Sequence, residues 1–158
     1  MSGVSNVEQR LRTAGWELPE LRRPIGVYRG AVRSGDLLFV SGHGPIRDGQ
    51  RVLLGKVGGD LTIDEGRQAA ELVAVNALRT VKETIGSLEL VERVVKLLGF
   101  VNSATGFHEQ PRVIDAASEL LVAAFGDRGH HARSAVGMHE LPFGISVEIE
   151  MIMQVANA

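Results

Sequence analysis

Arg133 is a charged residue within HARSAVGMHELPFG, positions 131–144, a stretch of mostly small and apolar residues that otherwise has the character of a β-strand. A guanidinium group is planar and permanently charged, and it can donate two parallel hydrogen bonds to a carboxylate. A strand would fix the direction in which that group points. The pattern therefore indicates a carboxylate-binding residue, and the alternative is an arginine at a sheet edge that pairs with Glu148 or Glu150.

Glu148 is the second candidate, because a carboxylate can orient a water molecule or accept a proton from it. The segment SVEIEMIMQV alternates, which places Glu148 and Glu150 on one face of a strand and Val147 and Ile149 on the other. The alternative role for Glu148 is that of a solvated or ion-paired residue on a half-exposed strand.

Two other chemistries find little support in the spacing of the residues. The serine in Ser41-Gly42-His43-Gly44 is preceded by Phe39 and Val40, so the Gly-x-Ser-x-Gly motif of many serine hydrolases is absent. The glycines there serve a turn or let the backbone approach a ligand closely. No His-x-x-x-His or His-Glu-x-x-His spacing occurs, so no metal site is predicted from the histidines His43, His108, His130, His131 and His139.

The composition narrows the class of protein. A chain of 158 residues with 44% hydrophobic and 23% charged residues is typical of one globular domain. The absence of cysteine removes disulfide and thiolate chemistry. A net charge of −2 with 4% aromatic residues disfavours nucleic acid as a partner. The polar start of the sequence predicts no signal peptide, no window predicts a membrane span, and we expect a cytoplasmic protein.

Periodicity predicts strands that alternate with helices. A short helix bearing Val7 and Leu11 is expected to end near Gly15, and a hairpin is expected over residues 25–45. A capping box at Thr62 begins a helix that ends before Gly86. Further along the chain we expect a glycine-rich loop over 47–60 that can hold a short edge strand, a strand over 94–102, a helix from Pro111 to Gly126, and strands over 132–139 and 145–155.

The expected order is therefore β-β-α-β-α-β-β after the N-terminal helix, an α+β fold. Two helices interleaved with these strands predict one sheet that carries both helices on a single face. The opposite face would need a partner, so we expect the protein to associate with itself.

The sequence resembles the RidA/YjgF family over about residues 25–156. The resemblance rests on Ala-Arg-Ser at 132–134, Leu-Pro at 141–142 and Val-Glu-Ile-Glu at 147–150, together with Tyr28 and the Leu-Leu-Phe-Val-Ser-Gly of 37–42. It implies a chorismate-mutase-like fold over residues 23–158, with residues 1–22 as a helical extension. It also implies homotrimers with ligand sites in the clefts between subunits.

The same resemblance implies roles for individual residues. Arg133 would bind the substrate carboxylate and Glu148 would position or activate water, while Tyr28 and the backbone at Ser41 and Gly42 would line the cleft. Two further residues of that cleft depart from the family pattern. Asp115 stands where many members have asparagine and His43 where glutamine is common, so both would alter the pocket. The resemblance therefore implies a divergent branch of the family.

The implied reaction is hydrolysis of a reactive enamine or imine such as 2-aminoacrylate, which gives a 2-oxo acid and ammonia without a cofactor. Orientation of the substrate would supply most of the rate enhancement. The alternative is a non-catalytic module of the same fold that binds a small carboxylate metabolite or a partner protein. The ribonuclease activity in the family's older name is disfavoured by the slightly negative net charge and the few aromatic residues.

Overall fold

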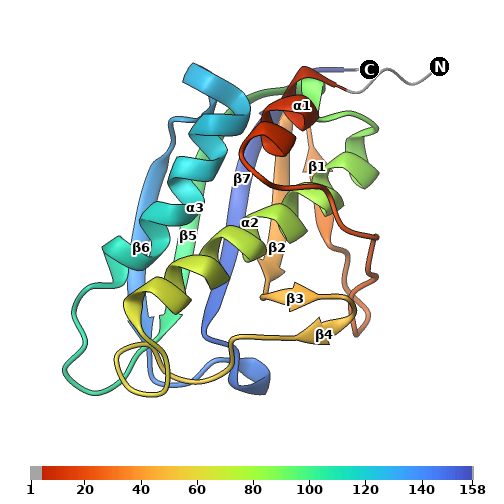
Figure 1. Ribbon diagram of the computed structural model, residues 1–158. Coiled ribbons are helices and arrows are strands. Elements are labelled where there is room, and N and C mark those ends of the chain that lie inside the picture. The colour runs from red at the N-terminus through yellow and green to blue at the C-terminus, as the bar shows by residue number, and fades with distance from the viewer. Residues whose placement is uncertain (1–4, 158) are drawn as a thin grey trace.

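The computed structural model describes residues 5–157, which form one five-stranded sheet and three α-helices (Figure 1). The strands are β1 (Ala31–Ser34), β2 (Leu37–His43), β5 (Val91–Asn102), β6 (Ala132–Met138) and β7 (Val147–Val155). Their order across the sheet is β1-β2-β7-β5-β6, and only β5 and β6 are parallel. The predicted order of elements and the α+β class are confirmed.

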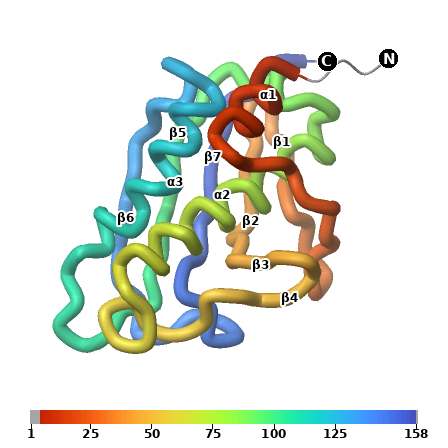
Figure 2. The backbone as a smooth tube through the Cα atoms, in the orientation of Figure 1, coloured from red at the N-terminus to blue at the C-terminus, as the bar shows by residue number. Residues whose placement is uncertain are grey.

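The long helices α2 (Ile63–Ile85) and α3 (Gln110–Phe125) lie side by side on one face of the sheet, as Figures 1 and 2 show. Thr62 begins α2 through the predicted capping box, in which its hydroxyl accepts from the amide of Glu65 and the Glu65 carboxylate accepts from the amide of Thr62. Small side chains such as Ala70 and Ala74 on α2 are fully buried, which lets the helix pack closely. The predicted single helical layer is therefore confirmed.

The final strand shows how one covered face organises the core. Val147, Ile149 and Met151 are buried beneath the helices, whereas Glu148 and Glu150 alternate with them on the other side. That opposite face carries exposed apolar side chains, including Val32 on β1, Phe39 on β2 and Val136 on β6. The expectation of an uncovered sheet face is thus confirmed.

Helix α1 (Asn6–Thr13) packs at the end of α3, and Gly15 follows it with a positive φ of 89°. Its Val7 and Leu11 are only 1% exposed and belong to the same hydrophobic core as the rest of the chain. The Glu8 carboxylate also lies 2.7 Å from the ammonium group of Lys82 on α2. The helix is thus fastened to the two-helix layer, and the boundary proposed at residue 22 stays a prediction.

The segment after β2 is more regular than the expected loop. Strands β3 (Ile46–Arg47) and β4 (Gln50–Arg51) form a separate hairpin around Asp48 and Gly49, whose φ angles are 49° and 80°. Two consecutive positive φ angles are typical of a type I′ turn, which Asp-Gly favours. Asp48-Gly49 is thus the turn of a hairpin, whereas the glycine-rich composition had predicted a loop at this position.

No helix among residues 5–157 is long and apolar enough to cross a membrane.

Gly129 provides a test of the packing that leads into β6. A Cβ atom at this buried position would collide with the backbone carbonyl oxygen of Leu121 on α3, which cannot move without distorting the helix. We expect Gly129→Ala to destabilise the protein by about 1–3 kcal/mol. This lowers the melting temperature by about 2–4 °C for each kcal/mol.

Thermal unfolding followed by circular dichroism measures the effect, with Gly59→Ala as the control. A Cβ at Gly59 would meet its nearest atom, the Ala104 methyl group, at 3.3 Å. Equal melting temperatures for the two variants would contradict the predicted collision.

Candidate functional site

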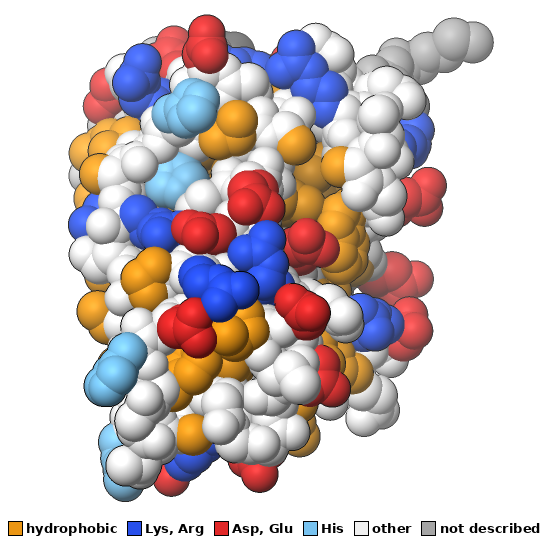
Figure 3. All heavy atoms as spheres, turned by 60° about the vertical axis from the view of Figure 1, so that its left-hand side comes forward, with side chains coloured by type: hydrophobic (Ala, Val, Ile, Leu, Met, Phe, Trp, Pro, Cys, Tyr) orange, Lys and Arg blue, Asp and Glu red, His pale blue; other side chains and the backbone are white. Residues whose placement is uncertain are grey.

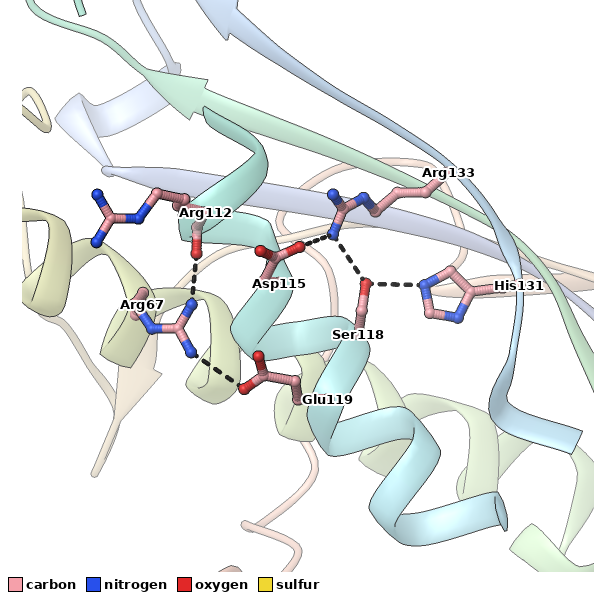
Figure 4. Close-up of polar contacts among 7 residues, drawn as sticks. All are labelled: Arg67, Arg112, Asp115, Ser118, Glu119, His131 and Arg133. Atoms are coloured by element: carbon pink, nitrogen blue, oxygen red, sulfur yellow. Dashed lines mark hydrogen bonds and ion pairs between the residues drawn. The ribbon is translucent and has the colours of Figure 1, made fainter. Parts of the chain in front are cut away.

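Arg133 lies on β6, the edge strand, and its side chain points toward the helical layer (Figure 4). It is paired in register with Leu97, a buried residue on the covered face of β5. The guanidinium Nη1 donates to Asp115 Oδ1 at 2.8 Å and to Ser118 Oγ at 3.2 Å. Because Asp115 and Ser118 are three residues apart on α3, the helix presents both acceptors on one side.

The partner of Arg133 is therefore Asp115, and neither Glu148 nor Glu150, which the ion-pair alternative had named. The Arg133 side chain is 23% exposed and that of Asp115 is 44% exposed, so the pair is reachable from solvent. A partly exposed pair of this kind contributes about 0–1 kcal/mol to folding. Its position matters more than its strength, because it fixes where the guanidinium lies.

His131 and Ser118 extend this contact into a chain of hydrogen bonds. His131 Nε2 lies 2.9 Å from Ser118 Oγ, and His131 Nδ1 lies 2.6 Å from the carbonyl oxygen of Gly129. Burial lowers the pKa of His131, and the nearby Arg133 and His130 lower it further against the opposing effect of the Gly129 carbonyl. A neutral ring that donates from Nδ1 to the carbonyl oxygen of Gly129 accepts a hydrogen bond from the Ser118 hydroxyl at Nε2. Ser118 then presents a lone pair to Arg133.

Glu148 lies on the opposite, uncovered face of the sheet. It is paired in register with Phe100 on the neighbouring strand β5. Its carboxyl group lies against Gly42, where an added Cβ would sit 2.9 Å from the Glu148 carboxyl carbon. Burial raises the pKa of Glu148, and the charge of Glu150 raises it further. Gly42 therefore makes room for a carboxyl group that holds its proton more tightly than usual.

Ser41 ties the segment that carries Tyr28 to the sheet. Its hydroxyl donates to the carbonyl oxygen of Arg29 at 2.6 Å, and its amide donates to the carbonyl oxygen of Gly30 at 2.9 Å. The Ser41 amide is thus used within the chain rather than directed at a ligand. Tyr28 is 56% exposed and precedes β1, which begins at Ala31, so the expected tyrosine-bearing first strand is a bend at this point.

His43 points into the layer between the sheet and α2. It is paired in register with Ile149, on the covered face, just after an irregularity in β2. Its Nδ1 lies 2.6 Å from the Ser41 carbonyl oxygen and its Nε2 lies 2.8 Å from Thr80 Oγ1. Burial lowers the pKa of His43 despite the Ser41 carbonyl, which acts in the opposite direction. Both ring nitrogens are occupied, so here His43 joins β2 to α2.

The expected site residues therefore fall into two groups within one chain. Arg133 and Asp115 meet at the β6–α3 edge, whereas Gly42 and Glu148 meet on the uncovered face, with β5 between β6 and β7. Sequence reasoning missed Ser118 as a partner of Arg133 and His131 as the partner of Ser118. The helical spacing of Asp115 and Ser118 was available as a signal, but nothing local indicated which strand α3 would face.

Charged side chains gather over the helical side of this edge (Figure 3). Arg67 on α2 donates to Glu119 at 3.0 Å and to the carbonyl oxygen of Arg112, and Arg112 pairs with Glu109. These charged residues near Arg133 and Asp115 are therefore paired with one another. Among residues 5–157, no group of three or more histidine and carboxylate side chains is arranged to hold a metal ion.

A family model described as "YjgF/chorismate_mutase-like, putative endoribonuclease" matches residues 8–149. The match begins within α1 and includes Arg133, Asp115 and Glu148. Protein TCP17 of Trypanosoma cruzi is 40% identical over 152 residues, which cover 96% of this chain and 95% of that protein.

Solved structures of other proteins are also similar to this chain. Protein Atu1372 of Agrobacterium tumefaciens, of unknown function, is 43% identical with a TM-score of 0.91, covering 96% of this chain and 93% of that one. A "putative endoribonuclease" of Shewanella oneidensis is 31% identical with a TM-score of 0.91, covering 94% and 99%. RidA of an Antarctic Psychrobacter is 25% identical with a TM-score of 0.56, covering 85% and 94%.

The raised pKa of Glu148 predicts a pH dependence of stability. The folded protein binds the Glu148 proton more tightly than the unfolded chain does, so stability is lost as the pH rises through the folded-state pKa. We expect Glu148→Gln, which is neutral at every pH, to melt at a higher temperature than the wild type at pH 8. The difference should shrink toward pH 4.

Melting temperatures across this pH range test the sign. Glu92→Gln, at an exposed position on β5, serves as the control that removes a carboxylate without relieving burial. A Glu148→Gln variant that is less stable than the wild type at pH 8 would show that the ionised carboxylate is stabilised in place.

Proposed function

We propose that this chain, which belongs to the YjgF/chorismate-mutase-like family, is a hydrolytic deaminase of reactive enamines and imines that carry a carboxylate. Water adds to the carbon of the C=N bond, and ammonia leaves, so that the imine becomes a 2-oxo acid. The observation that carries this proposal is Arg133, a guanidinium on a rigid strand, steadied by Ser118 and Asp115 and still partly exposed.

The reaction needs no strong nucleophile from the protein, because an imine already reacts with water. A guanidinium that binds the carboxylate holds the substrate in a fixed orientation. Such orientation raises the reaction rate by several orders of magnitude. The hydrogen bonds from α3 restrict the Arg133 side chain before the ligand arrives, which reduces the entropy lost on binding.

Glu148 is the proposed proton carrier. A carboxyl group with a raised pKa exchanges its proton closer to neutral pH than an ordinary glutamate does, which suits transfer between water and a departing nitrogen. Gly42 leaves the space in which that group lies. Tyr28 and the backbone near Ser41 are the proposed walls of the same half of the site.

We further propose that three copies assemble so that Arg133 of one copy meets Glu148 of the next. Two features support this. The two residues lie on opposite faces of one subunit's sheet. The uncovered face also has a hollow of about 270 Å³, lined by the apolar Val32, Phe39, Leu98 and Ile152 together with Lys96 and Glu150, a surface suited to association.

A non-catalytic module that binds a small carboxylate remains the second candidate. The separation of Arg133 from Glu148 within one subunit favours this candidate. Arg133 and its partners on α3 can hold a carboxylate without a residue from the other face of the sheet. Saturable binding of a 2-oxo acid, such as pyruvate, without faster imine hydrolysis would support it over the deaminase.

Arg133→Ala tests the deaminase. We expect loss of at least 100-fold in kcat/KM, since oriented binding of the carboxylate is lost, when 2-aminoacrylate is generated by a dehydratase and its hydrolysis is followed against the spontaneous rate. The control is Arg112→Ala, which removes an exposed arginine on the neighbouring helix α3 whose partner is Glu109. Wild-type turnover by Arg133→Ala would contradict the mechanism, and no acceleration by the wild type would contradict the function.

The proposed assembly predicts a particle of three times the 17.0 kDa chain mass. Phe39→Glu, which places a charge on the uncovered face where Phe39 is 44% exposed, should lower that mass toward one chain. Leu54→Glu places the same charge at an apolar residue of similar exposure, 47%, but this residue lies outside the five strands and the variant should keep the wild-type mass. Light scattering after gel filtration measures both, and a monomeric wild type would contradict the assembly.

A further inference from the structure

Two oppositely charged side chains lie on the uncovered face of the sheet without an ionic partner. Lys96 on β5 and Glu150 on β7 are partly buried, and both line the hollow that also contains Phe39 and Ile152. Lys96 donates from Nζ to Ser134 Oγ at 3.2 Å. Among residues 5–157, neither Lys96 nor Glu150 takes part in a salt bridge. One apolar surface thus holds an unpaired cation and an unpaired anion.

The register of the sheet explains why these two charges do not meet within one chain. Lys96 is paired with Ile152, and Glu150 is paired with Leu98, so the two charged residues are diagonal neighbours on adjacent strands. Diagonal neighbours lie farther apart than residues directly opposite each other. Strand β5 lies between β7 and β6, and the ammonium group of Lys96 bonds to Ser134 on β6. Lys96 is therefore directed away from the strand that carries Glu150.

Association through this face would make the unpaired charges costly. Removal of water from a charged group is unfavourable unless a group of opposite charge replaces that water. Glu150 also lies close enough to Glu148 for its charge to raise the pKa of that residue, so negative charge is concentrated on β7. Three copies that share an axis would bring three such strands toward one another. Lys96 is the cation that lines the same hollow and can offset this repulsion.

We propose that Lys96 of one copy pairs with Glu150 of the next copy, so that the uncovered face recognises a second copy of this chain by charge as well as by apolar contact. In a ring of three copies, each chain gives its cation to one neighbour and its anion to the other. This is a head-to-tail contact that closes on itself. The inference rests on the assembly proposed above and is independent of the deaminase reaction.

Charge reversal tests the proposed pair. Lys96→Glu and Glu150→Lys each place like charges at every contact between copies, so each should raise the protein concentration at which half of the assemblies dissociate by about tenfold or more. Light scattering over a dilution series measures this concentration. The double variant reverses both charges and should return to the wild-type value. Glu83→Lys is the control, because it makes the same charge change at an exposed position of α2, on the covered side of the sheet.

Mixing the two single variants distinguishes a contact between copies from a contact within one chain. Where a Lys96→Glu chain meets a Glu150→Lys chain, opposite charges face each other in either direction around the ring. A mixed trimer therefore has two favourable contacts and one repulsive contact, whereas a trimer of either variant alone has three repulsive contacts. With one variant isotopically labelled, native mass spectrometry should show mixed trimers in excess of random assortment.

The inference is overturned if the single variants dissociate like the wild type, if the double variant stays dissociated, or if mixing gives only random assortment. Circular dichroism verifies folding, and the neutral Lys96→Gln and Glu150→Gln, which should also weaken the assembly, replace any single variant that does not fold. Imine hydrolysis by the wild type is assayed separately. An assembly that depends on these charges without hydrolysis removes the deaminase and leaves the inference, whereas hydrolysis by an assembly insensitive to them does the reverse.

Discussion

The structure depends on one constraint, which is that two helices cover only one face of a five-stranded sheet. Every strand must therefore present apolar residues toward α2 and α3, and the alternation of β7 between Val147, Glu148 and Ile149 is the direct result. The same constraint leaves the other face apolar at Phe39 and polar at Glu148. The core, the uncovered face and the position of Glu148 thus share a single origin.

The surroundings of Arg133 follow from local connectivity within that sheet. Strands β5 and β6 are parallel neighbours, and α3 is the crossover that joins them, so the unit is a βαβ motif. The helix that must pack over β6 is the one that precedes it in the chain. Asp115 and Ser118 consequently reach Arg133 across a separation of only 18 and 15 residues, and Gly129 permits the tight return from helix to strand.

The paired guanidinium distinguishes this chain from the simplest form of a carboxylate clamp. Nη1 of Arg133 donates to both Asp115 Oδ1 and Ser118 Oγ, so the position of the guanidinium is fixed within the chain. The overall shape agrees with two relatives at a TM-score of 0.91, but with RidA of Psychrobacter only at 0.56.

The sequence by itself determined the long helices, the strands of the five-stranded sheet, their order, and the face on which each residue of β7 lies. A capping box at Thr62 or an alternation around Glu148 acts over a few residues and can be read directly. Only the tertiary structure decided that Arg133 meets Asp115 and that His43 turns inward to Thr80. The physical reason is that periodicity fixes which side of an element a residue occupies, whereas its partner depends on how elements distant in the sequence pack together.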